Sequence, residues 1–506
     1  MATVGPTQEA ELAAPLPRLA AGLLVFFTSA AVLVLEILAG RLLAPYVGVS
    51  LETYTGIIGT VLAGISLGTW LGGRAADLTD PRKTLGPLLI LGGALALCTV
   101  PAIRVFGGAQ LGSGPVAIVT LALVGFFGPA TVLSAVSPTV VKLQLADLDE
   151  TGRVVGRLSA LGTAGAIFGT FATGFVLVAT VPTTPLVLAL GAALVGVGVV
   201  LWARLARGRG VRLPVGMLVI GLLGTGLAVT VPGRCEFESA YFCARIEPDP
   251  GRETGRTLWL DQLRHSYVDL ADPTHLEFTY AQIMGDVIAT VAPGDAPIEA
   301  LHIGGGGFSL PRYIAAVRPG SFSAVLELDP TLLRIARTEL GLETGPDLQV
   351  RIGDARLSLA DEPSGRYDLV IGDAFGGQAV PWHLTTVEFI QDVKRVLAPG
   401  GVYAINLIDY PPLGFARAEV ATLREEFAHV AVAAPASRIE KASGGNFVLI
   451  ASDAPLDVKA IEDRNRSRGD NDLVISDAAM LDAFTAGAPI LTDDYAPVDQ
   501  LLTPLR

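Results

Sequence analysis

The chain has 506 residues, which is enough for two or three domains, and its mean hydropathy of +0.53 is too high for a wholly water-soluble protein. Charge is divided unevenly: residues 1–235 carry 14 Lys+Arg against 9 Asp+Glu, and the remaining residues carry 22 against 40. A downstream half this acidic argues against nucleic acid as a partner, because phosphate binding requires a cationic surface.

The first half of the chain is predicted to be a membrane domain. Residues 1–18, which contain three prolines, are expected to form a disordered head, and the apolar run that follows is too long for a cleavable signal peptide. Residues 19–232 contain seven windows of about 20 apolar residues, each long enough to cross a bilayer of about 30 Å. These windows are 19–39, 53–73, 84–103, 115–136, 158–181, 183–203 and 213–231.

Cationic residues alternate between the loops of this domain and predict its orientation. Every second loop is rich in Lys and Arg, and those loops together hold ten cations against two in the others. Such loops face the cytoplasm, so the N-terminus is expected inside. The ten cations are Arg74, Arg82, Lys83, Lys142, Arg153, Arg157, Arg204, Arg207, Arg209 and Arg212. Seven crossings of the membrane then place the second half of the chain outside the cytoplasm, although removing one span would reverse this prediction.

Two features of the membrane half have alternative interpretations. Glu36 is the one acid inside a predicted span, either as an interfacial partner of Arg41 or as a functional intramembrane acid. The run of residues 72–77, Gly-Gly-Arg-Ala-Ala-Asp, resembles the loop between helices two and three of major facilitator transporters. A transport-related role of the helices therefore remains an alternative.

Two cysteines lie in the predicted linker, residues 233–256. Cys235 and Cys243 are too few for a zinc site and have no histidine at ligand spacing, so no metal is expected. They form either a disulfide, which would persist in an oxidising compartment, or two free thiols.

The second half of the chain centres on a glycine loop. Residues 301–303 form an apolar strand that runs directly into Gly304, Gly305 and Gly306, and a second strand ends at Glu327. Asp354 and Asp373 follow a third and a fourth predicted strand. Glycines allow close approach of the backbone to a ligand, and an acid at the end of the second strand accepts a ribose hydroxyl. The pattern predicts a nucleotide-binding βαβ unit.

Strands and helices alternate from residue 298 to residue 407, which predicts a parallel, doubly wound sheet. A short hairpin is expected at residues 258–268 and a helix at 275–291. Two late strands, at 429–433 and 446–452, would complete the sheet. This domain is predicted to span residues 257–455, with a C-terminal extension at 456–506.

Residues 257–452 resemble the spermidine synthase (polyamine aminopropyltransferase) family. The hairpin run at residues 260–266, Leu-Asp-Gln-Leu-Arg-His-Ser, is similar to the family's Leu-Asp-Gly-x-x-Gln-Ser. Membrane helices followed by this domain and by the Asp-Asp-Tyr-Ala-Pro run at 493–497 resemble bacterial fused membrane–spermidine synthase proteins. The resemblance implies a class I S-adenosylmethionine methyltransferase fold, which is Rossmann-like, preceded by a small β-hairpin.

The same resemblance implies roles for several residues. Gly304, Gly305 and Gly306 would line the co-substrate, Glu327 would hold its ribose, and Asp354 with Ala355 would contact its adenine. Asp373 would act as the base on an attacking amine. The implied co-substrate is S-adenosylmethionine or its decarboxylated form. In the alternative interpretation, Glu327 and Asp354 only cap helices, and His265 and His383 are packed or surface residues.

The chain departs from the family pattern on the amine side of the site. Gly307 and Gly376 replace family aspartates, His265 replaces a glutamine, and Ala281-Gln282 replaces His-Glu. These changes leave two functions open: a membrane-bound transferase, or a binding module on a transporter-like bundle that has lost its chemistry. An exported domain would also lack a supply of a co-substrate made in the cytoplasm. The expected partners are the lipid bilayer, a small cationic amine and further copies of the chain in a homo-oligomer.

Overall fold

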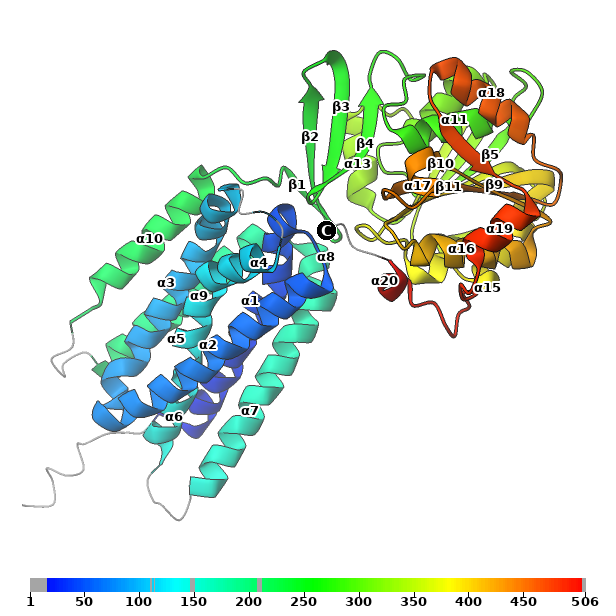
Figure 1. Ribbon diagram of the computed structural model, residues 1–506. Coiled ribbons are helices and arrows are strands. Elements are labelled where there is room, and N and C mark those ends of the chain that lie inside the picture. Colours follow the sequence, from blue (N-terminus) through cyan, green and yellow to red (C-terminus); the bar gives the residue numbers. More distant parts are fainter. Residues whose placement is uncertain (1–15, 110–111, 113, 146–150, 207–211, 503–506) are drawn as a thin grey trace, which may run out of the picture. The chain divides into compact units, whose positions relative to one another are not determined.

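The computed structural model describes residues 16–109, 112, 114–145, 151–206 and 212–502 (Figure 1). The predicted head up to residue 15, and Arg207 and Arg209 of the cationic loops, lie outside these described residues. The chain divides into two compact units, Met1–Arg245 with Leu260–Gln262 and Ile246–Trp259 with Leu263–Arg506.

The first unit is a helical bundle. In the described part of the chain, six helices are long and apolar enough to cross a membrane, and a seventh apolar helix, α10, has 16 residues. Short π-helical segments, labelled η1 and η3, interrupt two of the long helices, and a third, η4, directly follows α9. The elements are α1 (Arg18–Val47), α2 (Leu51–Leu78), α3 (Pro81–Gly108), α4 (Pro115–Ala122), η1 (Leu123–Phe127), α5 (Gly128–Ser134), α6 (Val136–Gln144), α7 (Thr151–Ala172), η3 (Thr173–Leu177), α8 (Val178–Thr180), α9 (Thr183–Leu201), η4 (Trp202–Ala206) and α10 (Val215–Thr230).

Glycines allow the helices to approach closely. A Cβ atom added at Gly165 of α7 would lie 2.1 Å from the carbonyl oxygen of Phe26, and one at Gly169 would lie 2.6 Å from that of Ala30. Small residues permit such backbone contacts where lipid removes the hydrophobic drive for association. Residue 165 contacts residue 26, and residue 169 contacts residue 30, so the residue numbers increase in the same direction along both helices. Helices α1 and α7 are therefore parallel.

The short helix α10 also runs in the same direction as α3. Gly221 approaches Ala94, and Gly224 approaches Cys98 one turn further along both helices. Near the end of α3, the Arg104 guanidinium donates to the carbonyl oxygen of Val231 at 2.9 Å. This bond satisfies a carbonyl at the carboxyl end of α10, which has no partner within its own helix.

A polar cluster holds the chain that follows α10. Arg41 donates to the carbonyl oxygens of Ser239 and Ala240, the latter at 3.0 Å, and lies 4.0 Å from the Glu238 carboxylate. Among the described residues Arg41 forms its ion pair with Glu238 and none with Glu36, so the interpretation of Arg41 as the partner of Glu36 is wrong. Cys235 and Cys243 of the same segment form a disulfide.

A four-stranded sheet of order β1-β2-β3-β4 precedes the larger sheet. Its last two strands are the hairpin predicted at residues 258–268, and Asp261 at its turn has a φ of 52°. The segment predicted as a linker contains β1, β2 and the beginning of β3. The strands are β1 (Phe237–Glu238), β2 (Cys243–Asp249), β3 (Arg252–Leu260) and β4 (Leu263–Asp269).

The second unit contains an eight-stranded sheet of order β12-β10-β11-β9-β8-β5-β6-β7. Strands β7, β6, β5, β8 and β9 are parallel, whereas β11 pairs antiparallel with both β9 and β10. The predicted α/β methyltransferase-like fold is confirmed. The strands are β5 (Glu299–Ile303), β6 (Phe322–Glu327), β7 (Leu348–Ile352), β8 (Tyr367–Gly372), β9 (Leu397–Asp409), β10 (His429–Pro435), β11 (Gly445–Ser452) and β12 (Asp472–Ile475).

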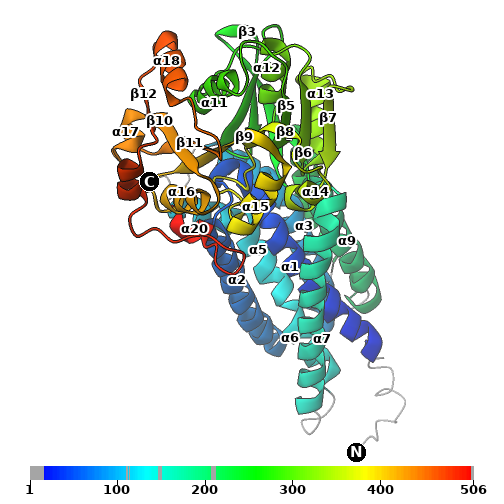
Figure 2. The ribbon, with the colours of Figure 1, turned by 90° about the vertical axis from the view of Figure 1, so that its right-hand side faces the viewer.

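Helices cover both faces of this sheet. Figure 2 shows α15 and α16 on one side and α11 and α12 on the other. The two faces carry separate apolar clusters, because successive side chains of a strand point to opposite sides. The helices are α11 (Thr279–Thr290), α12 (Ser309–Val317), α13 (Pro330–Glu339), α14 (Ala355–Ala360), η5 (Trp382–Leu384), α15 (Val387–Val396), α16 (Gly414–Glu426), α17 (Ala436–Ile439), α18 (Val458–Arg468), α19 (Ala478–Thr485) and α20 (Val498–Leu501).

The C-terminal residues pack into the core of this unit. Leu491 is fully buried, and its backbone bonds to Thr422 of α16 and to Val387 of α15. Asp493 receives two hydrogen bonds of 2.7 Å from the Arg356 guanidinium. The Asp-Asp-Tyr-Ala-Pro run therefore begins with a structural contact to α14.

We expect Leu491→Ala to lower the melting temperature of the full-length protein in detergent by about 5–15 °C, because a buried leucine truncated to alanine costs about 2–5 kcal/mol. Ile490→Ala, at the exposed neighbouring position, serves as the control and should change it by no more than about 2 °C. Equal melting temperatures for the two variants would contradict the docking of this segment.

Candidate functional site

The glycine loop lies between the carboxyl ends of β5 and β8. Gly304 has a φ of +95°, and a Cβ atom there would lie 2.4 Å from the carbonyl oxygen of Asp373. The amide of Asp373 donates to the carbonyl oxygen of Ile303 at 2.9 Å. Gly306, with a φ of +52°, completes the turn. Only glycine fits position 304 without strain, so this loop brings its backbone directly against the residue predicted as the base.

Glu327 holds the loop from the neighbouring strand. One carboxylate oxygen accepts from the amides of Gly305 at 2.8 Å and Gly306 at 3.3 Å, and the other accepts from the amide of Asp329 at 2.8 Å. The residue is only 5% exposed, and burial raises the pKa of its carboxyl despite these three donors. The predicted residues Gly305, Gly306 and Glu327 therefore form one hydrogen-bonded unit.

Asp373 follows β8, and each of its carboxylate oxygens accepts one hydrogen bond. Its Oδ1 accepts from Nδ2 of Asn406 at 2.8 Å, and its Oδ2 accepts from the Tyr280 hydroxyl at 3.2 Å. Burial raises the pKa of Asp373 to about 6, although both hydrogen bonds lower it. A carboxylate with this pKa can take up a proton near neutral pH, as a general base must.

The hairpin strand β4 closes the loop on its other side. The Gly307 amide donates to Oγ of Ser266 at 3.0 Å. A Cβ atom at Gly307 would lie 2.7 Å from the Ser266 Cβ atom, so an aspartate at this position would displace the hairpin. His265 packs edge-on against Phe375, and burial lowers the pKa of its imidazole to about 4. This histidine is neutral at physiological pH, and its place beside the loop agrees with a packed residue.

Asp354 and Ala355 lie one strand further along the sheet, after β7. Asp354 accepts from the Leu357 amide at 3.1 Å and so caps α14, and its second oxygen lies 3.1 Å from Nε2 of His383. Ala355 is the first residue of α14 and packs against the core. Of the two interpretations of Asp354, capping is observed, and contact with a ligand remains a prediction.

Large apolar side chains are exposed at the same edge of the sheet. Leu328 follows Glu327 directly, and Ile352 pairs with Glu327 across β6 and β7. Leu357 of α14 and Trp382 of η5 are at least half exposed. Exposed apolar side chains beside a carboxylate suit a flat heterocycle attached to a polar sugar.

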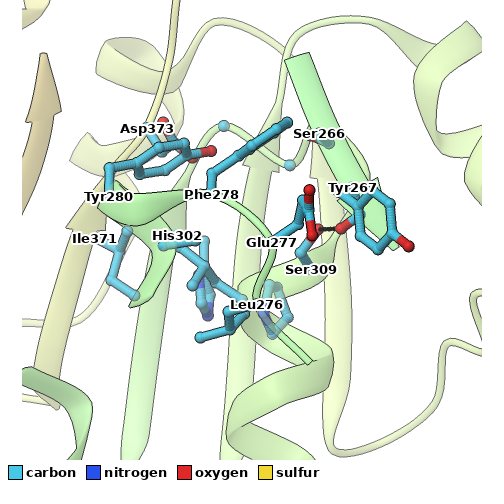
Figure 3. Close-up of a pocket in the computed structure, with 15 residues that line it drawn as sticks. Ser266, Tyr267, Leu276, Glu277, Phe278, Tyr280, His302, Ser309, Ile371 and Asp373 are labelled. Carbon is cyan, nitrogen blue, oxygen red and sulfur yellow. Dashed lines mark hydrogen bonds between the residues drawn. The ribbon is translucent and has the colours of Figure 1, made fainter. Parts of the chain in front are cut away.

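A pocket opens beside Asp373 on the α11 side of the glycine loop. It encloses about 470 Å³ of empty space that includes open solvent. Tyr280 points toward Asp373, and Phe278 stacks against Tyr280 with ring centroids 6.0 Å apart (Figure 3). Its walls also include Ser266, Glu277, His302 and Ser309. The pocket therefore combines aromatic side chains with two carboxylates, the half-buried Asp373 and the exposed Glu277.

Three contributors to the site were missed by the sequence analysis. Asn406 interrupts the apolar strand β9, which is the one signal that could have identified it. Tyr280 directly precedes the altered residues Ala281-Gln282, and Ser266 ends the hairpin run that carries the family resemblance. The contacts of all three depend on tertiary packing and leave no local periodicity.

No protein-family model matches the chain. A polyamine aminopropyltransferase of Vibrio vulnificus is 35% identical over 112 residues, covering 22% of this chain and 38% of that protein. One of Chromobacterium violaceum is 32% identical over 145 residues, covering 28% and 53%. The mouse eEF1A lysine and N-terminal methyltransferase is 31% identical over 123 residues, covering 22% and 18%. The chain thus spans about half or less of the length of these relatives.

Among solved structures, a probable spermidine synthase of Corynebacterium glutamicum is 29% identical to this chain. The match covers 53% of this chain and 98% of that protein, with a TM-score of 0.48.

The pKa of Asp373 predicts a pH dependence of stability. The native state raises this pKa from 3.8 to about 6, so its contribution is fully present below about pH 4 and is lost as pH rises through 6. The loss amounts to about 3 kcal/mol. We expect the melting temperature of the wild type to fall between pH 4 and 7 by about 5–10 °C more than that of Asp373→Asn.

Thermal unfolding of the full-length chain in detergent at several pH values measures this difference. Asp361→Asn, at an exposed position, is the matched control and should follow the wild type. Parallel curves for the wild type and Asp373→Asn would show that Asp373 has no raised pKa.

Proposed function

We propose that this chain, whose C-terminal domain is spermidine synthase-like, is a membrane-bound transferase that uses S-adenosylmethionine or its decarboxylated form. The proposed reaction moves an aminopropyl or a methyl group to an amine. The observation that carries it is the meeting of the glycine loop, Glu327 and Asp373 at one edge of a parallel sheet, where doubly wound folds bind their ligands.

The adenosine half of the co-substrate fits the residues that are present. Glu327 has its carboxylate fixed by amides at the end of β6, as a ribose-binding acid requires. The exposed Leu328 and Ile352 flank it and would cover an adenine ring. When bound, the co-substrate supplies an electrophilic carbon next to a positively charged sulfur.

Asp373 supplies the acid–base chemistry in this proposal. An amine attacks only after it loses its proton, and Asp373 lies beside the glycine loop with a pKa of about 6. Tyr280 and Asn406 each donate to one of its oxygens, which fixes the plane of the carboxylate. The remaining lone pairs of the carboxylate would accept the proton of the amine.

The second candidate function is a binding module that has kept the fold without the chemistry. It is favoured by the amine side of the site, where Gly376 and Gly307 carry no carboxylate. Position 307 has no room for one, because Ser266 contacts it. Without those charge-assisted bonds a diamine would lose about 1.5–3 kcal/mol per missing contact.

We also propose that the N-terminus is cytoplasmic, that α10 completes seven crossings and that the C-terminal domain is extracytoplasmic. The ten cations against two in alternate loops support this orientation. The parallel directions of α1 with α7 and of α3 with α10 agree with seven alternating passes. The Cys235–Cys243 disulfide agrees with an oxidising compartment.

Binding calorimetry tests the proposed function. The full-length protein in detergent should bind S-adenosylmethionine, its decarboxylated form or methylthioadenosine. Glu327→Ala should weaken binding at least tenfold, because a carboxylate–hydroxyl bond is worth about 1.5–3 kcal/mol. Glu343→Ala, at an exposed position, is the control and should bind normally. Absence of heat with all three ligands at millimolar concentration would reject the enzyme interpretation.

Reporter fusions test the orientation. Alkaline phosphatase fused after Gly255 should be active, and a fluorescent protein fused there should be dark. Fusions after Leu78, at the end of α2, should give the opposite pattern and serve as the control. Fluorescence from the fusion at Gly255 would place the domain in the cytoplasm. It would favour the transferase proposal over the binding-module proposal.

A further inference from the structure

Asp373 is the first of three polar side chains linked in a row across the sheet. Asn406 Nδ2 donates to Asp373 Oδ1 at 2.8 Å, and Asn446 Nδ2 donates to Asn406 Oδ1 at 2.9 Å. Strands β9 and β11 are antiparallel neighbours with Val448 opposite Asn406, so Asn446 occupies the diagonal position. Diagonal neighbours on one face are within reach of such side chains.

The chemistry of the row allows only one orientation of the central amide. An ionised carboxylate can only accept, so Asn406 must turn its NH2 group toward Asp373. Its carbonyl oxygen then points away and needs a donor, because Asn406 is 2% exposed and has little access to water. Asn446 provides that donor. The reversed amide would bring oxygen against the carboxylate and NH2 against NH2, and both bonds would be lost.

Arg438 holds Asn446 in place, and a small set of titratable side chains lies around Asp373. Nη1 of Arg438 on α17 donates to the Asn446 carbonyl oxygen at 2.8 Å, which fixes the beginning of β11. The Tyr280 hydroxyl of α11 faces Asp373 directly. Two further titratable groups face the glycine loop beside Asp373, namely His265 of β4 and Glu327 of β6.

We propose that Asn446 is a positioning residue that acts through Asn406 to hold Asp373 in the ionised, proton-accepting form. This inference rests on the proposed function, because it assigns Asn446 a part in the reaction of Asp373. Asn446 lies two strands from β8 in the sheet order and contacts Asp373 only through Asn406.

Removing the donor at position 446 should raise the proton affinity of Asp373. In Asn446→Leu the amide of Asn406 is free to turn, so its bond to the carboxylate is made only part of the time. We expect the fall in melting temperature that accompanies ionisation of Asp373 to move upward by about one pH unit. Asn446→Ala, which removes the same donor with a smaller side chain, should show the same shift if the leucine variant folds poorly.

Thermal unfolding of the full-length chain in detergent from pH 4 to 8 measures this shift without a substrate. The set comprises the wild type, Asn446→Leu, Asp373→Asn and the double variant, with Asn446→Gln as the control that retains an amide donor. The shift should be absent from Asn446→Gln. It should also be absent when the double variant is compared with Asp373→Asn, because both lack the Asp373 carboxylate. An unchanged pH dependence in Asn446→Leu and Asn446→Ala, or a shift that persists with Asp373→Asn, would overturn the proposal.

The same variants distinguish failure of the role proposed for Asn446 from failure of the proposed function. A chain that transfers no group to any amine would refute the function, whereas the titration would still decide the role of Asn446. If transfer is observed, Asn446→Leu should lower its rate up to about tenfold below pH 6 and less above pH 8. A rate reduced equally at every pH would mean a structural role and would contradict the proposal.

Discussion

The buried carboxylate of Glu327 is the interaction on which the candidate site depends. A buried charge is tolerated only when its oxygens are hydrogen-bonded, and three backbone amides meet this requirement here. Two of those amides belong to the glycine loop, so the same bonds that satisfy the charge also set the shape of the loop. The loop in turn brings Gly304 against the backbone of Asp373. A change at position 327 would therefore affect the glycine loop and, through the loop, its contact with Asp373.

The two halves of the site have different character. The half formed by β6 and β7 combines an oriented acid with exposed apolar side chains, which suits a nucleoside. The half around Asp373 contains aromatic side chains and a neutral histidine. At position 307 the hairpin leaves no room for a residue larger than glycine. Under the proposed function, the residues expected to contact the nucleoside are present, whereas those expected to contact the amine are replaced. This combination fits either a different acceptor or loss of the reaction.

Much of the second unit could be predicted from the sequence, because strands β5 to β8 are short runs that end in, or are followed directly by, glycine or an acid. The order of glycine loop, Glu327, Asp354 and Asp373 locates the carboxyl edge of the sheet without structural information. The partners of these residues could not be predicted. Asn446 reaches Asn406 only because β11 pairs with β9, and Arg41 bonds to residues almost 200 positions away. Pairings of this kind depend on tertiary packing, which local periodicity does not encode.

The most direct test of the account is a product analysis with the full-length protein. The protein is incubated with an amine mixture and with either S-adenosylmethionine or its decarboxylated form, and the nucleoside products are identified. Aminopropyl transfer releases methylthioadenosine, whereas methyl transfer releases S-adenosylhomocysteine. The account predicts that one of the two accumulates, that it requires the amine, and that Asp373→Asn abolishes it. If neither nucleoside forms above the level of the Asp373→Asn variant, the transferase proposal is contradicted and the binding module is the remaining candidate.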